Sequence, residues 1–104
     1  MKTDPWHSLI VFDVANPKRL RLIAKHLEGV ARRVQKSVFE SNWLTETRLA
    51  NLQEELSELM DPEEDDLRYY RLCNACSERI VHEGCGVGLL PEQRPFSILD
   101  DGDD

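Results

Sequence analysis

The sequence lacks the features that mark membrane and secreted proteins. Its longest apolar stretch falls far short of the roughly 18 to 20 residues that a membrane-spanning helix needs, and its N-terminus carries acidic Asp4 and Pro5 instead of a basic and then apolar leader. There are only three cysteines, an odd number that argues against a secreted disulfide scaffold. We therefore expect a soluble, cytoplasmic protein with no membrane partner.

The length of 104 residues fits one domain, and a domain of this size gains from burying further surface in a dimer. We assign residues 1–99 to a single domain. Residues 100–104 contain four aspartates and are expected to form a disordered acidic tail.

The net charge of −7 is distributed unevenly along the chain. Residues 1–48 carry nine Lys/Arg against five Asp/Glu, whereas residues 49–104 carry four against fifteen. Seven of the basic residues fall between Lys18 and Lys36, so an acidic protein overall could still present a local positive surface to nucleic acid. A solvated helix face explains the same pattern equally well.

Hydrophobic periodicity predicts the order of the elements. Residues 9–14 read as a strand that ends near Asp13, and Asn16 with Pro17 then cap a helix over residues 17–28. Further elements are two short strands within residues 30–44 with a turn near Lys36, a helix after Thr45 that stops at Asp61-Pro62, and strands over residues 67–72, 79–82 and 95–99. The acidic run of residues 63–66 is interpreted as a solvated connection.

This order predicts an α+β fold, a ferredoxin-like βαββαβ sandwich with an extra C-terminal strand. Such a sheet carries both helices on one face and leaves the other uncovered. A homodimer with the two sheets packed face to face is therefore expected.

Asp13 is the only charged residue in the first apolar run, and a carboxylate there needs compensation. Two interpretations stay open: a surface carboxylate satisfied by backbone N–H groups in the turn, or a ligand for a hard divalent cation.

Three motifs together resemble the CRISPR-associated protein two family, the small dimeric subunit of the spacer-acquisition machinery. The first is Phe12-Asp13-Val14-Ala15-Asn16-Pro17-Lys18-Arg19, the second is Gly29 followed by residues 33–40, and the third is residues 61–65 followed by Leu67-Arg68-Tyr69-Tyr70. The resemblance spans residues 7–99.

The resemblance implies a homodimer that lies between copies of the CRISPR integrase subunit and binds nucleic acid, namely duplex DNA or single-stranded RNA. The strand that extends the partner's sheet would consist of Phe96, Ser97, Ile98 and Leu99. The candidates for contacts with the nucleic-acid backbone are Lys18, Arg19, Arg32, Arg33 and Lys36.

Family members are also described as metal-dependent nucleases, which implies that Asp13 is catalytic and binds Mg²⁺ or Mn²⁺ at the dimer axis. Many members carry a second acidic residue a few positions later, where this sequence has Asn16. Asn16 fits a helix cap better than a metal ligand. Ser37 and Gln35 would lie near Asp13 if the second motif folds beside it, whereas His7 and His26 are expected to lie away from it.

The sequence leaves two alternatives open. A zinc site could be formed by Cys73, Cys76, His82 and Cys85, although reduced thiols are favoured. A redox motif at Cys73-Asn-Ala-Cys76 is disfavoured because no helix is predicted to start there. The alternative function is a small ferredoxin-like ligand-binding regulatory domain that has no role with nucleic acid.

Overall fold

The computed structural model describes residues 5–84. Its elements are β1 (His7–Asp13), α1 (Pro17–Glu28), β2 (Arg32–Gln35), β3 (Val38–Ser41), α2 (Glu46–Leu59), β4 (Asp66–Leu72) and the short helix α3 (Asn74–Ser77). This succession confirms the predicted order from the first strand to residue 72. The predicted dimer strand over residues 96–99, the tail over residues 100–104 and Cys85 lie outside the described residues.

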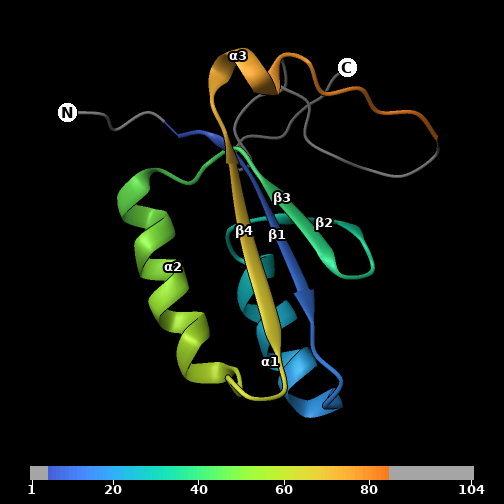
Figure 1. Cartoon of the computed structure of the whole chain (residues 1–104), viewed down its shortest axis with the longest axis vertical. Coiled ribbons are helices and arrows are strands. Elements are labelled where there is room, and N and C mark those ends of the chain that lie inside the picture. Colours follow the sequence, from blue (N-terminus) through green and yellow to red (C-terminus); the bar gives the residue numbers. More distant parts are fainter. Residues whose placement is uncertain (1–4, 85–104) are drawn as a thin grey trace.

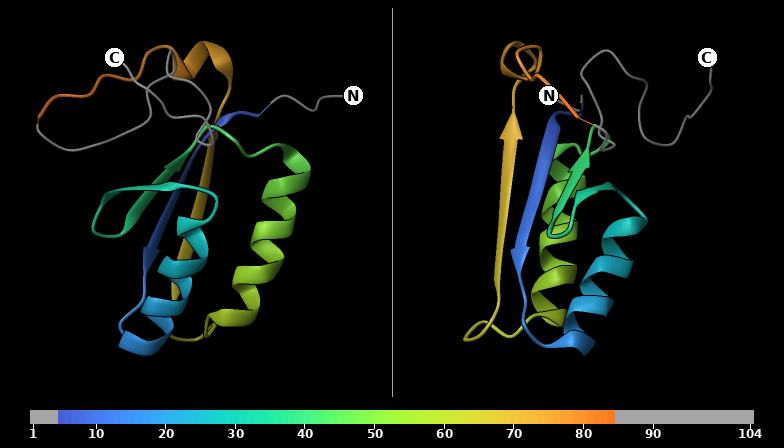
Figure 2. Two further views of the ribbon diagram at one scale, coloured as in Figure 1. Left: turned by 180° about the vertical axis from the view of Figure 1, so that it is seen from behind. Right: turned by 90° about the vertical axis from the view of Figure 1, so that its right-hand side faces the viewer.

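The four strands form one antiparallel sheet in the order β2-β3-β1-β4. Both long helices, α1 and α2, lie on the same face of this sheet, as the edge-on view in Figure 2 shows. The arrangement is the predicted ferredoxin-like sandwich, with β2 and β4 at the two edges (Figure 1). Within residues 5–84 there is no helix with the length and apolar character needed to cross a membrane.

Local sequence signals set the starts of both long helices. The side-chain oxygen of Asn16 accepts a hydrogen bond from the backbone N–H of Arg19 at 3.0 Å, and Pro17 occupies the first turn of α1. Thr45 caps α2 in the same way, by accepting from the backbone N–H of Arg48 at 3.2 Å. The predicted cap at Asn16 is confirmed, and Thr45 caps the helix that was expected after it.

The core lies between the helices and one face of the sheet. Strand alternation turns Ile10 and Phe12 of β1 toward the helices, where they are buried, and turns Leu9, Val11 and Asp13 to the opposite face. The buried apolar residues are Ile10, Phe12, Val14, Ile23, Ala24, Leu27, Ala31, Phe39, Leu44, Leu49, Leu52 and Leu56. Among residues 5–84, no helix lies over the face that carries Asp13, and we call it the open face.

Three aromatic residues that could have stacked on bases belong to the core region. Phe39 is fully buried, with its ring centroid 5.8 Å from that of Phe12. Trp43 and Tyr69 pack against the core, and burial raises the pKa of Tyr69 to about 12. Packing, not base stacking, therefore accounts for these side chains.

The chain after β4 differs from the sequence-based expectation. The strand predicted over residues 79–82 is absent; instead, α3 follows β4 directly. The backbone N–H groups of Arg79 and Ile80 donate to the carbonyls of Cys76 and Ser77 at 3.0 and 3.2 Å. Because these donors are used within a local turn, they cannot pair with a neighbouring strand.

Candidate metal and nucleic-acid site

Asp13 is the last residue of β1, and its carboxylate is exposed on the open face. Within residues 5–84 this carboxylate makes no hydrogen bond and no ion pair. The backbone N–H groups of the turn therefore do not satisfy it in the described part of the chain. The side chain is free to bind a ligand from solution.

Asp66, the first residue of β4, is the direct register partner of Asp13. Side chains at opposed positions of an antiparallel pair point to the same face, with Cβ atoms about 4.5–5.5 Å apart. The fold thus gives Asp13 a second carboxylate as its neighbour. Sequence analysis missed this pair because Asp66 stands in the acidic run that was interpreted as a connection.

Arg68 partly compensates the charge of Asp66. Its Nε donates to the Asp66 carboxylate at 2.9 Å, and the side chains of Tyr70 and Asp66 raise the pKa of the Arg68 guanidinium. Both members of this ion pair are largely exposed, so the pairing is weak and can exchange with another ligand. Alternation along β4 places Arg68 and Tyr70 on the open face with Asp66.

The two carboxylates fit a hydrated magnesium ion better than a dehydrated one. Residues 5–84 contain no group of three or more His, Cys, Asp or Glu that could hold a metal. Mg²⁺ prefers oxygen ligands and commonly keeps several waters while it binds one or two carboxylates. Asp13 and Asp66 would be the ligands from this chain.

Asn16 does not belong to this ligand set. Its side-chain oxygen is already used as the cap of α1, the role that sequence analysis favoured. The residue expected to stand at the family's second acidic position is therefore engaged as a helix cap.

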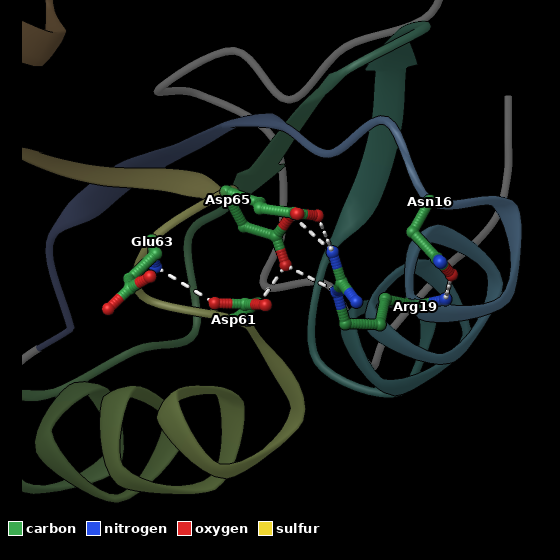
Figure 3. A network of polar contacts seen from close by, with 6 residues as sticks. Asn16, Arg19, Asp61, Glu63 and Asp65 are labelled. Atoms are coloured by element: carbon green, nitrogen blue, oxygen red, sulfur yellow. Dashed lines mark hydrogen bonds and ion pairs between the residues drawn. The ribbon is translucent and has the colours of Figure 1, made fainter.

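A second carboxylate of the acidic run, Asp65, is buried instead of solvated. Its side chain has no exposed surface and accepts two hydrogen bonds from the Arg19 guanidinium, at 2.7 and 3.2 Å. The backbone N–H of Asp61 donates to the same carboxylate at 2.8 Å. Figure 3 shows the Arg19 guanidinium directed at Asp65. The interpretation of residues 63–66 as a wholly solvated connection is wrong for Asp65.

These contacts shift the pKa values of both partners. The Arg19 guanidinium, followed by the backbone N–H of Asp61, holds the pKa of the Asp65 carboxyl below its usual range. Asp65 in turn raises the pKa of Arg19, with a smaller contribution from Glu64, which accepts from Arg19 at 3.1 Å. The pair stays fully charged at neutral pH.

The Arg19–Asp65 ion pair joins the segments that hold the two open-face carboxylates. Arg19 lies in the first turn of α1, which follows Asp13, and Asp65 directly precedes Asp66. The ion pair therefore fixes the ends of β1 and β4 relative to each other. The predicted contact of Arg19 with nucleic acid stays a prediction, but the structure gives this guanidinium a structural partner.

The other four basic candidates are exposed and lie on two parts of the surface. Lys36 lies in the β2–β3 turn, whose Ser37 carbonyl accepts from the backbone N–H of Phe12 at 3.1 Å, so the second motif folds beside Asp13. Lys18 begins α1 near the same end. Arg32 and Arg33 lie at the start of the edge strand β2, and the Arg33 guanidinium is 5.3 Å from the Phe39 ring centroid.

Neither histidine is placed to serve Asp13. His7 begins β1, at the opposite end of the strand, and is buried with Nε2 3.6 Å from Glu40. His26 lies on the exposed side of α1, where Nε2 contacts Glu55 of α2 at 2.6 Å. Both positions agree with sequence analysis.

The fold and the exposed acidic pair define a ferredoxin-like protein with a candidate divalent-cation site at the end of its first strand. The family model for "CRISPR associated protein Cas2" matches residues 6–80. The chain belongs to this family, and the resemblance seen in the sequence is confirmed.

Individual relatives agree with this assignment. The CRISPR-associated endonuclease Cas2 of Halalkalibacterium halodurans is 42% identical over 81 residues, which cover 73% of this chain and 83% of the relative. The CRISPR-associated endoribonuclease Cas2 1 of Chloroflexus aurantiacus is 44% identical over 85 residues, covering 81% of this chain and 88% of the relative.

Two solved structures share the fold. The crystal structure of Streptococcus pyogenes Cas2 at pH 6.5 matches with a TM-score of 0.64 and 31% identity, over 75% of this chain and 99% of that one. A chain of a partial Cas6-RT-Cas1–Cas2 complex matches with a TM-score of 0.64 and 30% identity, over 74% of this chain and 89% of that one.

Proposed function

We propose that this protein is a CRISPR spacer-acquisition subunit, a homodimer that binds nucleic acid, bridges integrase subunits and has a magnesium-dependent endonuclease activity on RNA or DNA. The position of Asp13 carries the nuclease part of the proposal, because its exposed carboxylate is unengaged within residues 5–84. The names of the relatives, an endonuclease and an endoribonuclease, support the reaction class. A relative within a Cas1–Cas2 complex supports the integrase as partner.

Asp13 would bind the cation, with Asp66 as its neighbour. A divalent cation held there would supply an activated water and would neutralise charge on the phosphodiester. Lys18 and Lys36 are exposed on the two segments that flank Asp13, so both could hold backbone phosphates near it. Arg68, at the adjacent position on β4, could release Asp66 once a cation compensates that carboxylate.

The open face supports the homodimer. Leu9 and Val11 are only partly buried there, and Tyr70 is 46% exposed. A second copy packed face to face would remove this apolar surface from water. Two Asp13 carboxylates brought together near the dimer axis would repel each other, and a shared cation would relieve that repulsion.

The test is cleavage of labelled single-stranded RNA and duplex DNA by the wild type and by Asp13→Asn, with binding measured in the same samples. We expect cleavage by the wild type only with Mg²⁺, loss with EDTA, and at least about a 100-fold loss in Asp13→Asn. Glu54→Gln is the matched control, because it removes one exposed carboxylate on α2. It should cleave like the wild type.

The remaining parts of the proposal have separate readouts. Charge reversal at Lys18 and Lys36 should weaken nucleic-acid binding and reduce its salt dependence. Light scattering should give a dimer mass, and the integrase subunit should co-elute with the dimer. If Asp13→Asn and the wild type bind equally and neither cleaves, the protein is an adaptor and the nuclease part fails.

A further inference from the structure

The chain leaves β4 through a single helical turn that carries two cysteines. Cys73 precedes α3 with an extended backbone, and its carbonyl accepts the Ser77 N–H at 2.8 Å. Cys76 is the third residue of α3. This turn overturns the reason for disfavouring a redox motif, since a helix does start at Cys73-Asn-Ala-Cys76.

The geometry of the turn suits a disulfide. The thiols of Cys73 and Cys76 already hydrogen-bond to each other. A disulfide needs Cβ atoms about 3.5–4.5 Å apart, somewhat closer than the about 5–6 Å between residues three apart on a regular helix. Because Cys73 precedes α3 with an extended backbone, a small shift of that residue together with rotation of both side chains would bring the two sulfurs together. The backbone of the turn need not unfold.

The turn is held by contacts that do not involve the sulfur atoms. Ser77 is buried, and its hydroxyl donates to the Asn74 carbonyl at 3.0 Å. The Glu78 N–H donates to the same carbonyl at 3.1 Å. The relative position of the two cysteines is thus set in advance.

The two thiols differ in ways that suit an exchange reaction. The backbone N–H and the thiol of Cys76 lower the pKa of Cys73, whereas hydrogen bonding to Cys73 raises the pKa of Cys76. Cys76 is exposed and Cys73 is partly exposed, so small reagents can reach both. The Cys73 thiol is therefore favoured as the nucleophile, and the Cys76 thiol keeps its proton until a later step.

We propose that Cys73 and Cys76 form a reversible intramolecular disulfide by exchange with a low-molecular-weight disulfide such as oxidised glutathione. The Cys73 thiolate attacks one sulfur of the small disulfide, forming a mixed disulfide and releasing one small thiolate, which takes up a proton. Cys76 then loses its proton and attacks the Cys73 sulfur, which releases the second small thiol. Two electrons pass from the two cysteine sulfurs to the small disulfide, which is reduced to two thiols.

This site is separate from the candidate metal site. α3 lies beyond the C-terminal end of β4, whereas Asp66 lies at its N-terminal end (Figure 1). The proposal therefore does not depend on the proposed function, and its test needs no cleavage assay.

The test uses full-length Cys85→Ser, in which Cys73 and Cys76 are the only thiols. The protein is treated with excess oxidised glutathione, alkylated, and analysed by intact mass and peptide mapping. We expect a product with no alkyl group and no glutathione, lighter than the reduced protein by two hydrogens. Reduction with dithiothreitol should return both thiols.

Cys76→Ser and Cys73→Ser, each in the Cys85→Ser background, are the matched controls. Cys76→Ser should stop at a stable mixed disulfide on Cys73, because the second attack is impossible. Two glutathione adducts on Cys85→Ser, two thiols that remain alkylatable, or disulfide-linked chains in place of the internal disulfide would each overturn the proposal.

Discussion

At the Asp13 end of the sheet, two short hydrogen bonds between a guanidinium and a buried carboxylate join segments that are distant in sequence. At the His7 end, guanidinium groups stack on aromatic rings. Arg19 and Asp65 join α1 to the segment before β4 at the first end. At the second end, the Arg71 guanidinium is 4.4 Å from the Trp6 ring centroid, and that of Arg48 is 4.1 Å from the Trp43 ring centroid.

The two ends of the sheet also expose different functional groups. The ion pair at the Asp13 end compensates only the buried carboxylate of Asp65 and leaves Asp13 uncompensated within residues 5–84. In the acidic run of residues 63–66, Asp65 thus stabilises the fold, and Asp66 lies exposed beside Asp13. The opposite end exposes thiols instead, which bind or react with a different class of reagent.

The largest expected effect follows from breaking the ion pair between Arg19 and the buried Asp65. Asp65→Asn removes the charge that compensates Arg19, and it replaces an acceptor of the Asp61 N–H with an amide. Removing one member of a buried charged pair is strongly destabilising. Because 23% of the Arg19 side chain stays exposed, we expect a smaller cost of about 1–2 kcal/mol, which lowers the melting temperature by roughly 5–10 °C. Thermal unfolding followed by circular dichroism measures this.

Glu64→Gln is the control for the same guanidinium. Glu64 also accepts from Arg19, at 3.1 Å, but 70% of its side chain is exposed. Exposed ion pairs contribute little, so the melting temperature should change by less than about 2 °C. Equal losses in both variants would show that burial does not distinguish the two contacts.

The next largest expected effect is that the stability contributed by Asp65, at the Asp13 end of the sheet, depends on pH. The lowered pKa of Asp65 in the folded protein means that, as pH falls, the unfolded chain takes up the proton first. The stabilising contribution of Asp65 is therefore complete above the ordinary carboxyl pKa of about 4, which applies to the unfolded chain. It is lost as the pH falls from there through the lower pKa of the folded protein. The difference in melting temperature between wild type and Asp65→Asn should shrink by at least about half between pH 7 and pH 3.

That measurement also separates Asp65 from the other acidic groups. Both proteins lose stability in acid for shared reasons, and only the difference between their curves belongs to this carboxyl. A difference that stays constant down to pH 3 would mean that the Asp65 carboxyl does not titrate differently in the two states.

The frame of the fold was predictable because its signals are local. Asn16 and Thr45 cap their helices by contacts three residues away, and strand alternation in β1 and β4 assigns each side chain to a face. These patterns depend on neighbours in sequence, so one chain is enough to recognise them.

The partners within the acidic run were not predictable in the same way. Asp65 contacts Arg19 across 46 positions, and four adjacent acidic residues give no sign of which one will be buried. The pairing of Asp66 with Asp13 could have been inferred from the ferredoxin-like strand order, in which the fourth strand pairs with the first. α3 is too short to show periodicity, so Cys73 and Cys76 were assigned no common turn.

A smaller effect is expected from the exposed carboxylates, and it has the opposite sign. Like charges at directly opposed positions of a sheet are destabilising, so Asp13→Asn should increase the free energy of unfolding by about 0.2–1 kcal/mol. Urea unfolding at low salt in EDTA measures this, and the gain should diminish as salt screens the charges. A variant that stabilises the fold and also loses cleavage would distinguish Asp13 from Asp65, whose loss destabilises the fold.

Added Mg²⁺ provides the control for this comparison. A cation that binds only the folded site stabilises it by mass action, so Mg²⁺ should stabilise the wild type more than Asp13→Asn. Equal stabilisation of the two proteins would place the bound cation elsewhere.

The smallest expected effect compares the two thiols at the opposite end. In Cys85→Ser, limiting iodoacetamide below pH 8 should modify Cys73 about three to ten times faster than Cys76, because the thiolate reacts and the pKa of Cys73 is lowered while that of Cys76 is raised. Exposure alone predicts the reverse order, since Cys76 is the more accessible cysteine. Peptide mapping of the alkylated protein separates the two explanations. Preferential modification of Cys76 would mean that access, not hydrogen bonding within the turn, controls reactivity at this end of the sheet.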